Sequence, residues 1–249
     1  MSRTKVGLAL AGLLLIALLA SAPARLLTYF VPTDQVLLQG VSGSLWKGRA
    51  GSCLLRVTGG YLHLGEVRWQ LAPLSLLLLA PQLELDARWG AQQLSGEITL
   101  KGADSVRLRD IDAQLPASLL QQFLPVSLEG TLTAQFAELS LTEGLPVEAE
   151  GRVVWQGALW NSPLGRLALG SYAMDISQAR DEPLRGEVLT LAGPVSAEGE
   201  AEIDGRRYRI DALISAEDEG GLDPQLRQAL SLVAVPEGDG FRARLDAEF

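Results

Sequence analysis

The glycine-rich stretch LQGVSGSLWKGRAG, residues 38–51, is the segment whose spacing comes nearest to a known chemical motif. A phosphate-binding loop needs Gly-x4-Gly-Lys-Ser/Thr between a strand and a helix, whereas here Lys47 precedes Gly48 and no helical pattern follows. A nucleophile elbow needs Gly-x-Ser-x-Gly and a histidine that takes the serine proton, and Ser42 lacks that spacing. The stretch is therefore predicted to be structural.

The single histidine and the single cysteine offer no catalytic or metal-binding constellation. His63 alternates with leucines on a predicted strand, and one histidine without a cluster of other ligands builds neither a zinc site nor a catalytic triad. Cys53 has no partner for an internal disulfide and is predicted to be a small buried apolar side chain. The acidic segment 217–223 lacks the spacing of a calcium loop. We predict no catalytic residue, no metal site, no cofactor and no enzyme activity.

An apolar run near the N-terminus predicts a membrane anchor. It extends from Val6 to Ala22 after a short basic segment, and its 17 residues would span about 26 Å as a helix at about 1.5 Å per residue, against a hydrocarbon core of about 30 Å. Because a cleavable signal core is usually shorter, an uncleaved transmembrane helix over 6–24 is the favoured interpretation. The alternative is cleavage at the small-residue site Ala22-Pro23-Ala24.

The charge distribution predicts a topology and excludes one class of ligand. Positive residues flanking an anchor stay in the cytoplasm, so Arg3 and Lys5 place residues 1–5 there and 25–249 on the far side of the membrane. The whole chain carries a formal charge of −9. Nucleic acid is therefore not expected as a partner.

The rest of the chain has the period of two that is typical of β-strands. In LEGTLTAQFAELSL, residues 128–141, apolar and polar side chains alternate along the segment. The fold is predicted to be mainly β, an elongated and curved antiparallel sheet with two short helices, following the anchor. Strands are expected near 36–40, 44–49, 53–58, 66–72, 76–79, 83–89, 94–101, 106–114, 128–141, 147–155, 166–176, 186–191, 194–203, 207–215 and 241–248.

Turn and helix signals divide this pattern. Asp204-Gly205 and Asp239-Gly240 predict two-residue hairpin turns. Asp223 followed by Pro224 predicts the start of one helix, and a second helix of about two turns is expected between Pro116 and Pro125.

Two loosely related glycine–tryptophan groups suggest an internal repeat. Their glycines would permit sharp turns or close backbone approach, and their large apolar side chains would pack on a neighbouring layer. Two sequential β repeats, at about 35–142 and 143–249, are one interpretation. We single out these residues as a candidate interaction or structural motif: Gly43, Leu45, Trp46 and Gly48 in the first group, and Trp155, Gly157 and Trp160 in the second.

Taken in order, the motifs resemble the type II secretion system protein N family. The resemblance rests on the basic N-terminus and anchor, VSGSLWKGRA, VRWQLAPLSLLL, DAQLPASLL, EGRVVWQGALW and EGEAEIDGRRYRIDALIS. It implies a non-catalytic inner-membrane accessory component of the machine that exports folded proteins from the periplasm across the outer membrane. The implied partners are other secretion subunits, with the lipid bilayer contacted through residues 6–24.

Two other functions compete with this one. A periplasmic β-groove that binds or transfers lipid is the main alternative, with LSLLLLAPQLEL, residues 74–85, as its expected lining. An exported hydrolase or carbohydrate-binding enzyme would need two acids placed about 5–10 Å apart in a cleft. The sequence shows no motif for such an enzyme.

Overall fold

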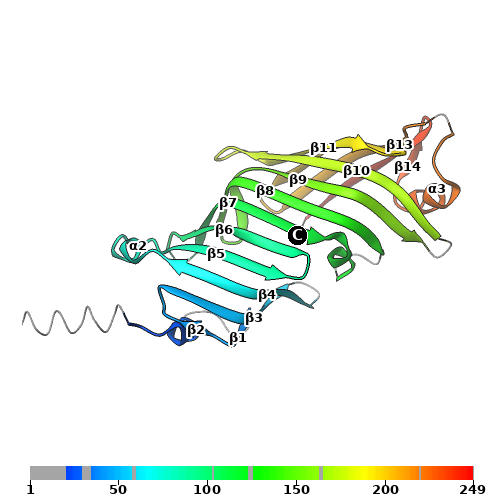
Figure 1. Ribbon diagram of the computed structural model, residues 1–249. Helices are drawn as coiled ribbons and strands as arrows, with labels where there is room; N and C mark the ends of the chain where they lie inside the picture. The colour runs from blue at the N-terminus through cyan, green and yellow to red at the C-terminus, as the bar shows by residue number, and fades with distance from the viewer. Residues whose placement is uncertain are drawn as a thin grey trace, which may run out of the picture. The chain divides into compact units, whose positions relative to one another are not determined.

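The computed structural model describes residues 21–29, 35–57, 60–102, 104–122, 126–162, 165–218 and 220–248. The chain divides into two compact units, Met1–Gly90 and Ala91–Phe249. Both units are built mainly from antiparallel strands (Figure 1), which confirms the predicted mainly β fold. The boundary of the expected repeats near residue 142 stays a prediction, and Thr142 pairs with Leu145 within a hairpin of the second unit.

The first unit is a small sheet in the strand order β1-β3-β4-β5, with β2 paired to β3. Its core contains Ala24, Ala50 and Trp69, against which Leu38 and Leu83 pack. The alternating residues of β4 explain this core, because Val67 and Trp69 are buried while Arg68 and Gln70 between them are exposed. The elements are η1 (Ala24–Tyr29), β1 (Val36–Gln39), β2 (Ser42–Gly43), β3 (Lys47–Val57), β4 (Gly60–Leu71), α2 (Pro73–Leu77) and β5 (Gln82–Trp89).

The strand expected near residues 76–79 is wrong, because α2 occupies Pro73–Leu77. Proline at the first position lacks only an N–H that a helix leaves unpaired there. The Ser75 hydroxyl donates a hydrogen bond to the Ala72 carbonyl at 2.6 Å and accepts one from the Gln82 backbone N–H at 2.9 Å. These two bonds join the helical turn to the beginning of β5.

The second unit is a larger antiparallel sheet in the strand order β6-β7-β8-β9-β10-β11-β12-β13-β15-β14. Consecutive strands are neighbours through β13, so the sheet is a meander until α3 intervenes before the last hairpin. The elements are β6 (Gln92–Leu100), β7 (Ser105–Pro116), η2 (Ala117–Gln122), β8 (Leu128–Thr142), β9 (Leu145–Ser162), β10 (Gly165–Gln178), β11 (Leu184–Ala192), β12 (Val195–Asp204), β13 (Arg207–Ala216), α3 (Pro224–Leu230), β14 (Val235–Glu237) and β15 (Gly240–Glu248).

The register of this sheet gathers apolar residues on one face and charged residues on the other. Because side chains alternate along every strand, residues paired across strands share a face. One row of paired residues is apolar throughout: Leu94, Ala113, Ala134, Val153, Met174, Val188, Gly199, Ala212 and Ala243. The adjacent row, on the opposite face, is polar: Gln135, Arg152, Asp175, Glu187, Glu200, Asp211 and Arg244.

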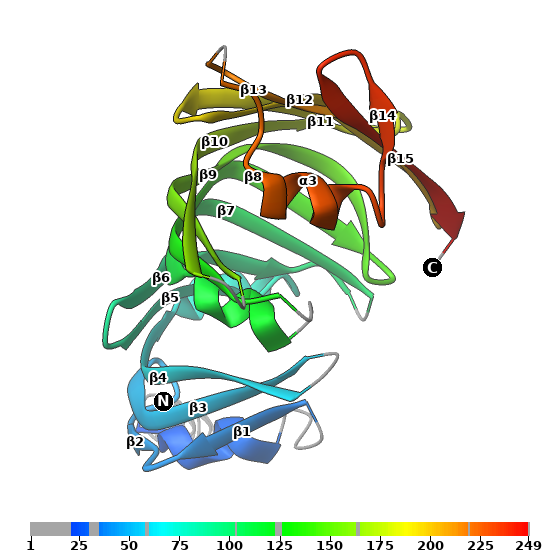
Figure 2. The same cartoon turned by 90° about the vertical axis from the view of Figure 1, so that its right-hand side faces the viewer.

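Helix α3 covers one end of the apolar face. Figure 2 shows it inside the curve made by strands β8 to β13. Asp223 caps the helix by accepting a hydrogen bond from the Gln225 N–H at 2.8 Å, as the sequence predicted. Leu222 and Leu226 are buried with Val195 and Phe241 of the sheet. The unit's main core therefore lies between α3 and this end of the sheet.

The two predicted hairpin turns and the helical segment predicted after Pro116 are present, with their positions or type shifted slightly. The β12–β13 hairpin turns at Gly205, whose φ is +58°, with Asp204 still paired to Arg207. The β14–β15 hairpin turns at Gly238, with φ of +59°, one residue before the predicted pair. The helix expected after Pro116 is a 3-10 helix, η2, and the expected stop at Pro125 lies outside the described residues.

The predicted membrane anchor lies almost entirely outside the described residues, which begin at Ser21. Its last residues contact the first unit: the Ala22 carbonyl accepts a hydrogen bond from the Leu45 N–H at 2.8 Å, and Ala24 is buried. Within the part of the chain that the structure describes, no helix is long and apolar enough to cross a membrane.

Candidate functional site

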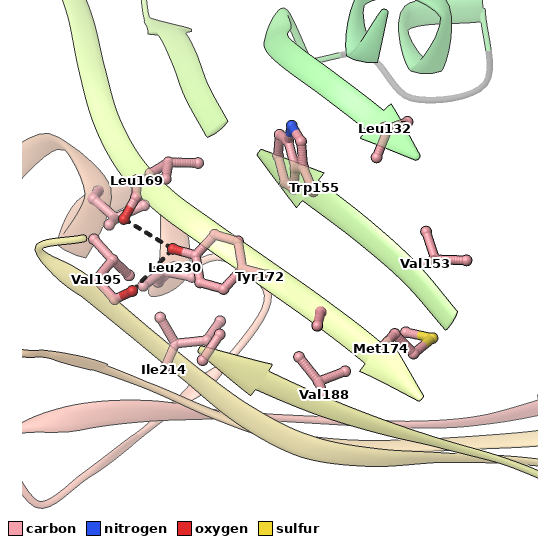
Figure 3. A pocket seen from close by; sticks show the side chains of 13 residues that line it. Leu132, Val153, Trp155, Leu169, Tyr172, Met174, Val188, Val195, Ile214 and Leu230 are labelled. Atoms are coloured by element: carbon pink, nitrogen blue, oxygen red, sulfur yellow. Dashed lines mark hydrogen bonds between the residues drawn. The ribbon is translucent and has the colours of Figure 1, made fainter. Parts of the chain in front are cut away.

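An apolar pocket of about 430 Å³ lies in the second unit between α3 and the apolar face of the sheet (Figure 3). Its volume falls within the range of about 300–1,000 Å³ that is typical of small-molecule sites. Five neighbouring strands, β9 to β13, contribute together with β8 and α3. The lining residues are Leu132, Val153, Trp155, Leu169, Tyr172, Ala173, Met174, Val188, Val195, Ala197, Ile214, Leu226 and Leu230.

A lateral row of large side chains forms one wall of the pocket. Leu132 pairs with Trp155, which pairs with Tyr172 on the next strand. The two aromatic rings lie 6.1 Å apart between centroids and are tilted by 48°, a separation within the range of favourable aromatic pairs. The β10 register shifts on both sides of Gly170, and such bulges redirect the following side chains.

The polar atoms of the wall already have hydrogen-bond partners. The Tyr172 hydroxyl lies 2.9 Å from both the Leu169 and the Val195 carbonyl oxygens, to which it donates (Figure 3). Burial raises the pKa of Tyr172 to about 12, so the phenol is neutral at physiological pH. The Trp155 indole N–H donates to the Glu129 carbonyl at 3.1 Å. The pocket is thus suited to bind an apolar group through contact area rather than through hydrogen bonds.

The predicted residues of the second glycine–tryptophan group lie in and around this pocket. Trp155 is part of its wall. Trp160 packs against the buried cluster beneath α3. Gly157 is exposed with φ of +57°, and its N–H donates to the Ser171 hydroxyl at 3.1 Å, so it shapes the β9 strand rather than the pocket surface.

The first glycine–tryptophan group forms the turn between β2 and β3 in the first unit. Gly43 has φ of +93°, and a Cβ there would lie 2.6 Å from the Lys47 carbonyl oxygen. A Cβ on Gly48 would lie 2.4 Å from a carbon of the Trp69 ring. The Leu45 carbonyl accepts a hydrogen bond from the Trp69 indole N–H at 3.2 Å, and the Trp46 carbonyl accepts one from the Leu71 N–H at 2.7 Å. The geometry here is that of a packed turn, and an interaction role for either group stays a prediction.

His63 and Cys53 have local structural contacts. The His63 ring lies 4.2 Å from the Trp89 ring between centroids. Its Nδ1 accepts a hydrogen bond from the Gly65 N–H at 3.2 Å, and its Nε2 lies 3.4 Å from the Ser52 hydroxyl. Cys53 is buried, and burial raises the pKa of its thiol. Within the described ranges, no three His, Cys, Asp or Glu side chains are grouped to hold a metal ion.

Sequence reasoning identified one pocket residue, Trp155, and missed the pocket itself. The proposed lipid lining at 74–85 falls in the first unit, where Leu74, Leu78 and Leu79 of α2 and the residues after it are 74–85% exposed. The pocket instead uses residues of β8 to β13, which are alternate ones on β9 and β12 but include the consecutive Tyr172, Ala173 and Met174 on β10, where the register shifts. The period of two predicted that these strands have an apolar face. It did not predict which part of that face α3 covers.

Comparisons with known proteins agree on one family. The family model for the type II secretion system (T2SS), protein N, matches residues 34–244. The type II secretion system protein N of Vibrio cholerae serotype O1 is 30% identical, with 94% of this chain and 93% of that protein covered. The Aeromonas hydrophila protein of the same name is 29% identical, with 92% and 90% covered, and that of Klebsiella pneumoniae is 33% identical, with 68% and 65% covered.

No solved structure matches the chain. The family match nevertheless extends through β1 to β13 and into β15, and so includes every strand that lines the pocket. The resemblance drawn from the sequence motifs is confirmed: this chain belongs to the type II secretion system protein N family.

Proposed function

We propose that the protein is a non-catalytic, inner-membrane accessory component of the type II secretion system that supports export of folded proteins from the periplasm across the outer membrane. The observation that carries the proposal is the family match over residues 34–244, which includes most of both units. The pocket is consistent with a protein that works by binding, because its lining offers apolar surface and no acid, base or nucleophile other than the neutral Tyr172 phenol.

The proposed topology has residues 1–5 in the cytoplasm, an uncleaved anchor over 6–24 and residues 25–249 in the periplasm. It is supported by Arg3 and Lys5 ahead of the apolar run. Alkaline phosphatase fused after residue 249 should be active, because that enzyme folds only outside the cytoplasm. An inactive but stable fusion would refute this topology.

An intact mass equal to that of the full chain would support an uncleaved anchor, and a mass lacking the first residues would indicate cleavage instead.

Contact with other secretion subunits is proposed to use exposed apolar side chains. In the second unit, Leu232, Val233 and Val235 follow α3 and are 83%, 75% and 70% exposed. A photo-crosslinking amino acid at Leu232 should capture a secretion subunit in cells that contain the whole system. The same amino acid at Glu187, on the charged face of the sheet, is the control. Equal yields from the two positions would contradict this surface.

The decisive test is an in-frame deletion in the native host. A known secreted enzyme should then accumulate in the periplasm, and a plasmid-borne copy of the wild-type chain should restore its release into the medium. Unchanged export in cells that demonstrably lack the protein would overturn the proposed function. A cytoplasmic marker enzyme assayed in the same fractions controls for lysis.

A further inference from the structure

We propose that the pocket of the second unit binds one acyl chain of a membrane phospholipid, with the headgroup left outside. This inference goes beyond the secretion role and rests only on the pocket's chemistry and geometry. The two proposals therefore fail separately, since export and lipid binding are measured in different experiments.

The chemistry of the wall favours a hydrocarbon over a peptide or a polar metabolite. The Tyr172 hydroxyl is bonded to two backbone carbonyls, and the Trp155 indole N–H to a third. A peptide strand would bring N–H and C=O groups into this space and leave them unpaired, which is costly in an apolar site. An acyl chain carries no such groups, and each buried methylene adds favourable transfer free energy.

The apolar face of the sheet extends beyond the covered pocket. A second apolar row lies on the same face of the sheet. It is two residues along each strand from the row that contains Val153, Met174 and Val188, and it includes several very small residues. A Cβ on Gly151 would lie 2.3 Å from the Phe136 ring, and one on Gly186 would lie 3.2 Å from the Met174 sulfur, so neighbouring apolar side chains cover both glycines. The row consists of Ile111, Phe136, Gly151, Ile176, Gly186, Ala201, Ile210 and Leu245.

This second row lies outside the pocket covered by α3, since none of its residues lines it. At its far end, Ile210 and Leu245 remain 37% and 50% exposed. The apolar face therefore continues beyond the covered pocket and is partly open to solvent at Ile210 and Leu245. An acyl chain held in the covered pocket would leave it on the side of this apolar row, where the exposed part of the chain meets further apolar side chains.

The test uses the purified full-length chain in vesicles of bacterial phospholipids that contain a trace of phospholipid with a diazirine on its acyl tail. After irradiation, mass spectrometry should find label on peptides from β9, β10 and β11 that line the pocket. Val188→Phe should lower this labelling about 16-fold, because the larger side chain removes room for about two methylenes at about fourfold each. Glu187→Phe is the matched control, since it adds the same side chain to the opposite face of the same strand.

A second measurement separates a filled pocket from a misfolded one. Competition by saturated fatty acids from octanoate to palmitate should show tighter binding with each added methylene until the pocket is full. In Val188→Phe the preferred length should become shorter, which a merely unfolded protein would not show. Thermal unfolding of both variants reports their folding directly.

Several results would overturn the proposal. One is label confined to the apolar run 6–22, and another is pocket labelling that Val188→Phe and Glu187→Phe change equally. Labelling by a diazirine fatty acid in solution but not by the phospholipid would exclude a membrane phospholipid as the source. A photo-crosslinking amino acid at Val188 that captures a polypeptide instead of lipid would assign the pocket to a protein partner.

Discussion

Replacing Leu226 by alanine tests whether α3 is held on the sheet by its buried leucine. Leu226 is only 8% exposed and belongs to the cluster with Val195, Leu222 and Phe241. A buried leucine-to-alanine change usually costs about 2–5 kcal/mol, and more where a larger cavity remains. Because Leu226 also borders the existing pocket, part of its surface has few packing partners to lose. We therefore expect about 2–3 kcal/mol of destabilisation, at the low end of that range.

The assay is thermal and urea unfolding of the full-length protein. For a domain of 150–250 residues each kcal/mol lowers Tm by about 2–4 °C, so Leu226→Ala should lower it by about 4–12 °C. Leu232→Ala is the control, because Leu232 lies just beyond the same helix but is 83% exposed, and its change should stay within about 0.5 kcal/mol. Equal effects of the two substitutions would refute the inference that the Leu226 contact holds α3.

The other predictions concern single sites. Gly48→Ala should destabilise the first unit by about 1–3 kcal/mol in urea unfolding, since the new Cβ would lie 2.4 Å from the buried Trp69 indole ring. Gly51→Ala on the same strand is the control and should be nearly neutral, because its Cβ would meet only the Gln39 carbonyl oxygen at 3.8 Å. The hydrogen bond from Arg152 lowers the pKa of Asp175. The stabilisation from this pair should therefore be complete above the pKa of the unfolded carboxyl group and be lost as pH falls through the pKa of the folded one. Arg152→Gln should raise the Asp175 pKa in an NMR titration, and an unchanged value would contradict this assignment. Cys53 is buried with a raised thiol pKa, so a maleimide should label it slowly until the protein unfolds, and rapid labelling of the native chain would contradict its burial.

The strands were predictable because their signal is local. Residues 128–136 alternate in sequence, and β8 occupies Leu128–Thr142, with a register shift between Phe136 and Glu138 where the alternation changes phase. The α3 start was equally local, since Asp223 and Pro224 specify a cap and a first helical residue by themselves. By contrast, the run LSLLLL has a single polar residue, Ser75. It therefore shows no polar–apolar periodicity that would distinguish a helix from a strand. Its helical state depends on the Ser75 hydrogen bonds to Ala72 and Gln82.

The pocket required information that no single segment holds. Leu132 and Leu230 line the same space although 98 positions separate them in the chain. Strand alternation specifies that Val153, Met174 and Val188 share a face, but not which part of that face α3 covers. That choice depends on the contacts that Leu226 makes with Val195 and Phe241, which lie on other elements of the unit.

The attachment of α3 has a kinetic consequence for anything bound beneath it. The helix spans only Pro224–Leu230, and its described ties to the rest of the unit are a few leucine contacts and side-chain bonds such as that between Gln225 and the Ser162 hydroxyl. A segment with so few contacts opens locally at a lower free energy than the hydrogen-bonded sheet, so its amides should exchange with deuterated water before those of β10 and β13. The residence time of a bound chain would then follow the opening rate of one short helix rather than the unfolding rate of the unit.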